Sequence, residues 1–236
     1  MQAVAHTAAS APVEDYVKAI YALTLEPDQA ASTSQIAERL GITAGSVSTM
    51  IKRMDASGLA EHVPYRGARL TPAGRKLALA VIRRHRLLEL FLATSLDIPW
   101  EAVHGFADAL EHAASDELVE LIATKLGDPV ADPHGDPIPN RLLEVDDRAQ
   151  PTIAELRPGE HARIVRVSDA EPEMLRYLTA QGIAIGDELE LIERQPFDGP
   201  CLVRLRNHAE RNLGLRLAQA IHVERLRARR PPARGG

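Results

Sequence analysis

Two capped helical runs joined by a short glycine turn restrict most strongly what this chain can fold into. Ser32 and Gln35 have the spacing of a capping box at the start of SQIAERL, and Gly41 ends that run. The second run, AGSVSTMIKRMDAS, begins after Thr43 and ends at Gly58. Short helices in this arrangement, the second rich in small polar residues, are typical of a helix-turn-helix.

The sequence that follows predicts a wing. Two short segments, LAEHV and ARLT, flank the basic turn PYRG, and Thr71-Pro72 then starts a new helix. A further helix is expected over VEDYVKAIYALTL, ahead of the helix-turn-helix. Residues 1–75 are therefore expected to form a winged helix-turn-helix DNA-binding domain.

The rest of the chain divides into a helical part and a strand-rich part. The runs LALAVIRRHRLLELFLAT, VHGFADALEH and SDELVELIATKLG predict a helical domain over residues 76–140, closed by a proline- and glycine-rich loop. After a linker at 141–152, HARIVRV, DELELIER and LVRLR alternate with period two, and EPEMLRYLTAQ reads as a short helix. We expect a small β-barrel over 153–228 and a disordered tail at 229–236, in a chain that is mainly α.

Composition and charge narrow the class of protein. The single cysteine, Cys201, excludes a disulfide framework and a cysteine-based zinc site. No apolar run approaches the roughly 20 residues that cross a bilayer, and no signal peptide is recognisable, so a cytoplasmic protein without a membrane partner is expected. The net charge is −5, yet basic residues dominate 43–86 and acidic residues dominate 97–147. This segregation suggests two kinds of partner.

Short polar and basic side chains on the predicted recognition helix and wing are candidates for DNA contact. Small hydroxyls can reach base edges or phosphates, and basic side chains should meet phosphate. No arginine or long amide stands at the helix start, so DNA shape and thymine methyl groups are expected to carry part of the specificity. The plainer interpretation of Ser48 and Thr49 is ordinary helix surface. The candidates are Ser34, on the helical run before the recognition helix, and Ser46, Ser48, Thr49, Lys52, Arg53, Arg66 and Arg69.

Two helices of the middle region carry imidazoles and carboxylates at helical spacing. His85 and Glu89 lie four residues apart within an apolar stripe, where they need a partner or a bound ion. The next helix aligns four such side chains along one side: His104, Asp108, Glu111 and His112. A solvated face usually includes Lys and Arg, whereas this one holds only residue types that bind metals. A metal site is favoured; a buried His–Glu pair and a solvated face remain alternatives.

The order of these elements resembles the diphtheria-toxin-repressor family of metal-dependent transcriptional regulators. The elements H-x₃-E, V-H-x₆-E-H and D-P-H-G-x-P-I-P follow one another in sequence, within a resemblance that covers about residues 13–140. The region after 152 is similar to the SH3-like third domain of the longer members. The resemblance implies a homodimer on a palindromic operator, in which metal binding fixes the spacing of two recognition helices about one DNA turn apart.

The resemblance also implies two metal sites. One would use His85, Glu89 and His104. The other would use Asp15, Asp108, Glu111 and His112. A further ligand from the third domain would be Glu171, while Met174 is expected to pack.

The ligand types also bear on which ion is bound. Iron-type members place a methionine and a cysteine where this chain has Asp15 and Asp108, so the oxygen ligands favour Mn²⁺, with Fe²⁺ a close second. Manganese-type members place a glutamate where Lys18 stands, so one of their ligands is absent here.

These observations predict a metal-dependent repressor of metal-uptake genes that acts on no small-molecule substrate. A metal-independent winged-helix regulator with structural histidines is the main alternative, and it predicts DNA binding that chelators leave unchanged. A hydrolase ranks third because the chain has no HExxH, no GxSxG and no glycine-rich phosphate loop. We therefore do not expect an enzyme.

Overall fold

The computed structural model describes residues 10–24, 29–146 and 148–226, which fall into two compact units. The first unit comprises residues 1–88, 107–130 and 138–145, and the second comprises 89–106, 131–137 and 146–236. The boundary passes through two helices, α4 and α5, so each of these helices contributes residues to both units. The expected disordered tail at 229–236 lies outside the described residues.

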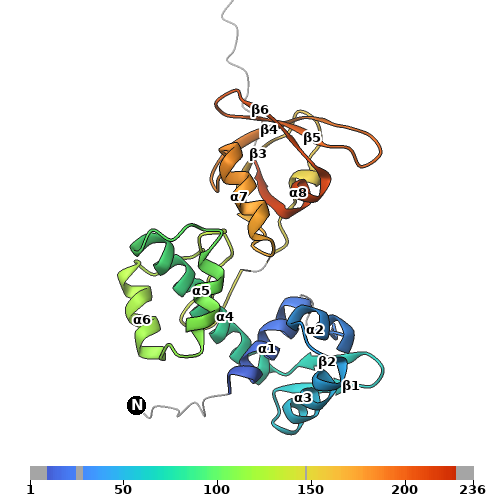
Figure 1. Ribbon diagram of the computed structural model, residues 1–236, viewed down its shortest axis with the longest axis vertical. Helices are drawn as coiled ribbons and strands as arrows, with labels where there is room; N and C mark the ends of the chain where they lie inside the picture. The colour runs from blue at the N-terminus through green and yellow to red at the C-terminus, as the bar shows by residue number, and fades with distance from the viewer. Residues whose placement is uncertain (1–9, 25–28, 147, 227–236) are drawn as a thin grey trace, which may run out of the picture. The chain divides into compact units, whose positions relative to one another are not determined.

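The start of the first unit is a winged helix-turn-helix (Figure 1). Its elements are α1 (Ala11–Leu23), α2 (Thr33–Leu40), α3 (Ala44–Ala56), β1 (Ala60–Val63) and β2 (Gly67–Leu70). The capping box at Ser32 is confirmed: its hydroxyl accepts from the Gln35 backbone, and the Gln35 side chain accepts from the Ser32 N–H at 2.9 Å. Gly41 ends α2 in the left-handed region at φ 65°, and Thr43 caps α3. Local capping thus sets the predicted turn.

The wing is fastened to the segment just before α2 rather than free. β1 and β2 pair antiparallel from Ala60–Leu70 to Val63–Gly67, and an isolated bridge joins Ala31 to Ala68. Gly67 has φ 106°, and a Cβ there would lie 2.0 Å from the Ala31 carbonyl oxygen. Only glycine fits this approach, so the base of the wing has a fixed position.

Buried apolar side chains from α1, α2, α3 and α4 form the core of this unit. Its fully or almost fully buried members include Val17, Ile20, Ile36, Val47, Ile51 and Met54. Of the expected linker, Leu143 and Val145 also pack against this core.

Three helices follow, as predicted: α4 (Pro72–Ser95), α5 (Val103–Glu111) and α6 (Asp116–Lys125). The buried Arg83 guanidinium on α4 donates to the Pro139 carbonyl at 2.8 Å and to Glu120 on α6 at 2.9 Å. This clamp holds α6 and the 138–140 segment against α4. Among the described residues, no helix combines the length and apolar content that crossing a membrane requires.

The C-terminal part is rich in strands. Its elements are η1 (Ile153–Glu155), β3 (His161–Val167), α7 (Pro172–Gln181), β4 (Glu188–Arg194), β5 (Cys201–Leu205), β6 (Glu210–Leu213), α8 (Leu215–Ala220) and β7 (Ile221–Arg225). The strands form one antiparallel sheet in the order β6-β5-β4-β3-β7, with α7 beside it (Figure 1). Alternate strand residues and α7 bury a separate apolar core that includes Cys201.

The sheet corrects one expectation. A closed barrel requires the two edge strands to pair, but β6 and β7 do not pair within the described residues. The short helix α8 leads from one edge to the other, so a helical turn stands where a closing ladder would lie.

A loop at 131–137 packs against β3 within the second unit. The Val167 N–H donates to the His134 carbonyl at 2.9 Å. Gly135 has φ 84°, and a Cβ there would lie 2.0 Å from the Val165 carbonyl oxygen. The loop that follows the helical region in sequence is therefore built onto the C-terminal sheet.

Candidate metal centres and nucleic-acid interface

The first cluster of ligand-type side chains joins α1 to the end of α5. Asp15, Glu111 and His112 each offer a ligand atom, and these atoms lie within 4.8 Å of one another. His112 Nε2 lies 2.9 Å from Asp15 Oδ1 and 3.6 Å from Glu111 Oε1. We call this cluster, together with Asp108 and the adjoining Lys18, the Glu111 centre.

Glu111 is the buried carboxylate of this centre, with a side chain that is 1 % exposed. The Lys18 ammonium donates to its two oxygens at 2.7 and 3.0 Å, and His85 Nδ1 lies 2.6 Å from Oε2. Burial would raise the pKa of Glu111, but the His85 hydrogen bond and the Lys18 charge outweigh burial and lower it. The carboxylate therefore stays ionised and able to bind a cation.

Glu14 orients His112 from the other side of the ring. Its Oε2 lies 2.7 Å from His112 Nδ1 and accepts from Arg84 Nη1 at 3.3 Å. With Nδ1–H directed at Glu14, Nε2 faces Asp15 and Glu111 and is the atom available to a metal. Burial lowers the pKa of His112, but the Glu14 hydrogen bond and the charges of Asp15 and Glu111 raise it overall. A metal ion at Nε2 therefore competes with a proton.

A second cluster, which we call the Glu89 centre, lies within the second unit and consists of Glu89, His104, His134 and Asp169. His104 Nδ1 lies 3.1 Å from Glu89 Oε1 and 3.1 Å from Asp169 Oδ2. Ligand atoms of Glu89, His134 and Asp169 all lie within 4.8 Å of one another. Burial raises the pKa of Asp169, but His104 outweighs burial and lowers it.

The geometry of His134 fits a bound cation. Its side chain is fully buried, and Nε2 lies 2.7 Å from the Trp100 carbonyl oxygen, which can only accept. The proton of a neutral ring is therefore on Nε2, so Nδ1 presents a lone pair. No hydrogen-bond partner reaches Nδ1 among the described residues. The carboxylate oxygen Oε2 of Glu89 lies 4.0 Å from it. A lone pair buried beside a carboxylate is costly unless a cation lies between them.

Each predicted ligand has an ionisable neighbour within its own unit. Glu89 lies beside His104, whereas the His85 ring hydrogen-bonds to Glu111. Glu171 is not brought to either centre: it precedes α7 and pairs with Arg216, and Asp169 lies beside His104 instead.

Three participating residues were missed at the sequence level: Glu14, His134 and Asp169. Glu14 directly precedes the predicted ligand Asp15. His134 stands in the DPHG motif, whose turn Asp132 orders by accepting from the His134 N–H at 2.8 Å. The motif was the available signal for His134, while nothing local distinguishes Asp169.

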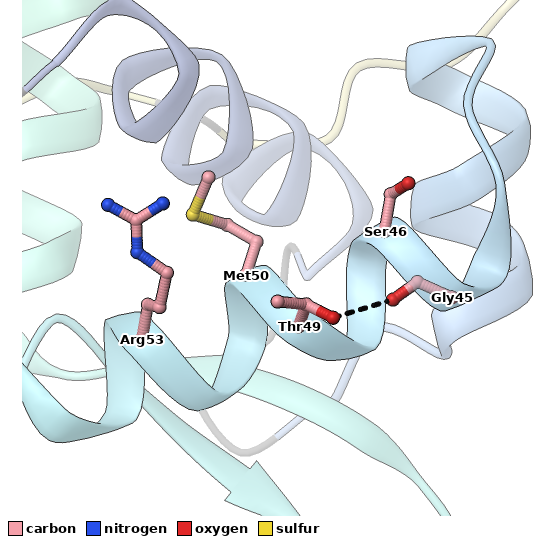
Figure 2. Close-up of a pocket in the computed structure, with 5 residues that line it drawn as sticks. All are labelled: Gly45, Ser46, Thr49, Met50 and Arg53. Atoms are coloured by element: carbon pink, nitrogen blue, oxygen red, sulfur yellow. Dashed lines mark hydrogen bonds between the residues drawn. The ribbon is translucent and has the colours of Figure 1, made fainter.

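Most of the predicted DNA-contacting side chains lie along α3 and the wing, and Ser34 lies on α2. Figure 2 shows Ser46, Thr49, Met50 and Arg53 on α3, where they line a shallow surface pocket with Gly45. The Thr49 hydroxyl donates to the Gly45 carbonyl at 3.1 Å (Figure 2). The proton of this hydroxyl is thus committed to the helix, which leaves its oxygen as an acceptor.

The remaining candidates are mostly exposed. Ser34, Ser48, Lys52 and Arg66 face solvent. The Ser48 hydroxyl donates to the Ala44 carbonyl at 3.0 Å. Arg69 differs because it pairs with Glu61 across the wing at 2.6 Å, which offsets its charge before any phosphate arrives.

Three family descriptions match the chain in succession. Residues 9–68 match the iron dependent repressor N-terminal DNA binding domain, and residues 71–140 match the iron dependent repressor metal binding and dimerisation domain. Residues 152–225 match the FeoA domain.

Similar proteins cover almost the whole chain. The diphtheria toxin repressor of Corynebacterium glutamicum is 33 % identical over 223 residues, covering 90 % of this chain and 96 % of the relative. The iron-dependent repressor IdeR of Mycobacterium tuberculosis is 30 % identical over 226 residues, with the same coverage. Among solved structures, a manganese-dependent transcriptional repressor in complex with manganese has a TM-score of 0.84 at 39 % identity, covering 91 % of this chain and 100 % of that one.

Proposed function

Because this chain belongs to the diphtheria toxin repressor family of metal-dependent transcriptional repressors, we propose that it represses metal-uptake genes when a divalent ion binds at the Glu111 centre. It is a DNA-binding regulator rather than an enzyme, and it acts on operator DNA as a dimer. The metal-independent alternative is not favoured, since the relatives are metal-dependent repressors.

We propose Mn²⁺ as the physiological ion, with Fe²⁺ as the close second. The donor atoms of both centres are carboxylate oxygens and imidazole nitrogens, and neither centre includes sulfur. Hard oxygen ligands suit Mn²⁺ and give softer competitors little advantage. Some relatives are named for iron and several similar structures for manganese, so the donor chemistry carries this choice.

Asp15, Glu111 and His112 would hold the ion at the Glu111 centre, with Asp108 beside them. A bound divalent ion supplies positive charge between carboxylates that otherwise repel one another. Asp15 belongs to the first helix of the winged helix-turn-helix, whereas Glu111 is the last residue of α5 and His112 follows it directly. An ion bound by these ligands would therefore link the DNA-binding helices to the helical region, and it would favour one orientation of the DNA-binding helices among several.

The Glu89 centre is proposed as a second ion site, held by Glu89, His104, His134 and Asp169. His134 and Asp169 are attached to the C-terminal sheet through the 131–137 loop and the end of β3. An ion there would tie the end of α4 to that sheet. The buried Nδ1 lone pair of His134 supports this proposal.

DNA contact is proposed for the hydroxyls and basic side chains of α3 and the wing. Lys52, Arg53 and Arg66 would neutralise phosphates, and Ser46 and Thr49 would approach the base edges. A dimer places two such helices about one DNA turn apart. Exposed leucines on α6 and α5 are suited to the dimer contact: Leu110, Leu118 and Leu121.

The convergence of Asp15 with Glu111 and His112 carries this proposal, and selection from a random double-stranded DNA library tests it. Wild type, Asp15→Ala and the exposed-carboxylate control Glu173→Ala would be compared with Mn²⁺ and with EDTA. We expect a palindrome to be enriched only with Mn²⁺, by wild type and the control but not by Asp15→Ala. Equal enrichment with EDTA would show that the histidines and carboxylates are structural.

A further inference from the structure

Lys18 lies inside the Glu111 centre and occupies a position with the surroundings of a metal ion. It stands one helical turn after Asp15 on α1. Its Nζ lies 2.7 and 3.0 Å from the two Glu111 oxygens, 3.1 Å from Asp108 Oδ1 and 3.5 Å from His85 Nδ1. Two carboxylates from α5 thus converge on one ammonium, and the His85 ring, whose Nδ1–H donates to Glu111, lies beside them.

This ammonium stays charged. Burial lowers the pKa of Lys18, but the charges and hydrogen bonds of Glu111 and Asp108 outweigh it and raise the pKa overall. The Lys18 side chain is only one-quarter exposed, and Glu111 is almost fully buried, so solvent screens the pair weakly. A lysine ammonium is a compact point charge with three donors, which suits it to a cation position.

Both oxygens of Glu111 have a neighbour besides Lys18. Oε2 lies 2.6 Å from His85 Nδ1, and Oε1 lies 3.6 Å from His112 Nε2. A carboxylate can bridge two ions through its two oxygens. Here the Lys18 ammonium reaches both oxygens and is already one of the cations beside them.

The formal charges agree with a single ion. Glu14 and Arg84 pair with each other and leave no net charge. Asp15, Asp108 and Glu111 contribute three negative charges and Lys18 one positive charge, so two negative charges remain. One divalent cation balances them. A glutamate in place of Lys18 would leave four negative charges, which two divalent cations would balance.

We propose that Lys18 is a built-in cation that takes the place of a second metal ion beside Glu111, and so limits the Glu111 centre to one divalent ion. The inference rests on the proposed function, because it assumes that Asp15, Glu111 and His112 bind that ion. Lys18 then determines the stoichiometry of the centre, and the lysine-to-glutamate change converts a one-ion centre into a two-ion centre.

The test measures Mn²⁺ binding to the full chain by calorimetry and by electron paramagnetic resonance. All proteins carry Asp169→Asn, which weakens the Glu89 centre and leaves the Glu111 centre to be counted. Lys18→Glu is compared with the unsubstituted Lys18 protein and with Lys125→Glu, which makes the same charge change at an exposed position on α6. Two Mn²⁺ ions about 4 Å apart, as in two-metal sites, are magnetically coupled and broaden the six-line spectrum.

We expect one uncoupled ion per chain with Lys18 present and with Lys125→Glu, and one additional, coupled ion per chain in Lys18→Glu. A coupled pair in the protein that retains Lys18 would overturn the inference, and this result does not depend on whether the variant folds. A folded Lys18→Glu protein that binds one uncoupled ion would overturn it as well. If the protein that retains Lys18 binds no Mn²⁺, or if Asp15→Asn leaves its Mn²⁺ binding unchanged, the proposed function is refuted instead.

Discussion

Replacing Asp15 with asparagine should separate metal binding from the stability of the metal-free protein. The substitution removes one charge from the Glu111 centre with little change in shape. The Asp15 side chain is 45 % exposed and its contact is His112 Nε2 at 2.9 Å. An ion pair this exposed contributes about 0–1 kcal/mol, so the metal-free variant should melt within a few degrees of wild type.

The loss on the metal-bound side is larger. Removing a group that supports a bound metal typically weakens affinity 10- to 100-fold, and we take about 100-fold for a charged ligand. At free Mn²⁺ near 100 times the wild-type Kd, binding stabilises wild type by about 2.7 kcal/mol and the variant by about 0.4 kcal/mol. The difference of about 2.3 kcal/mol corresponds to roughly 5–9 °C in Tm for a chain of this size.

The assay is thermal unfolding with and without Mn²⁺, in an Asp169→Asn background that weakens the Glu89 centre. Glu173→Gln, an exposed carboxylate on α7, is the matched control and should retain the full Mn²⁺-induced increase in Tm. An equal Mn²⁺-induced increase in Asp15→Asn and in the control would refute the assignment of Asp15 as a ligand. A large drop in the Tm of the metal-free variant would show that Asp15 is mainly structural.

Three further predictions follow from the same geometry. Trp100 is the only tryptophan, and its ring stacks on His134 with centroids 6.0 Å apart. Mn²⁺ at the Glu89 centre should therefore quench its fluorescence, and Asp169→Asn should shift the quenching to higher Mn²⁺ concentrations. Tryptophan emission that is unchanged at saturating Mn²⁺ would count against that centre. The pKa of His112 is raised by Glu14, Asp15 and Glu111 against burial, so Mn²⁺ affinity measured by calorimetry should fall as pH drops through that raised pKa, where a proton must be displaced. Mn²⁺ affinity that does not change with pH would exclude His112 as a ligand. In the metal-free protein, the protonated His112 ring stabilises the fold at pH values below the pKa that His112 has in the unfolded chain. This contribution is lost as pH rises through the pKa of His112 in the folded protein. Lys52→Ala should reduce the slope of log K against log salt for operator binding by about 1, whereas Lys125→Ala should leave the slope unchanged.

The sequence was sufficient where local chemistry determines structure. The caps at Ser32 and Thr43 and the glycine at 41 set the helix-turn-helix, and each acts through residues at most a few positions away. The helical spacing of His104, Asp108 and Glu111 similarly placed these side chains along α5, and His112 follows directly after its last residue. Such features depend on short-range periodicity, which a single sequence records directly.

Prediction failed where long-range pairing decides the position. His134 approaches Glu89 because Gly135 packs on the Val165 carbonyl and the His134 carbonyl pairs with β3. Asp169 lies in the segment after β3, two residues before the predicted ligand Glu171, and the direction of that loop is not encoded by any local spacing. The edges of the open sheet, β6 and β7, were likewise not apparent, because pairing partners far along the chain define them.

The attachment of the 131–137 loop to β3 has a consequence for how this architecture can change over evolutionary time. A descendant that lost the sequence after the helical region would retain the Glu111 centre whole, since all of its side chains precede residue 113. It would lose Asp169 outright, together with the backbone partner that holds His134 in place. Gain or loss of the C-terminal part would therefore add or remove the Glu89 centre while leaving the Glu111 centre intact.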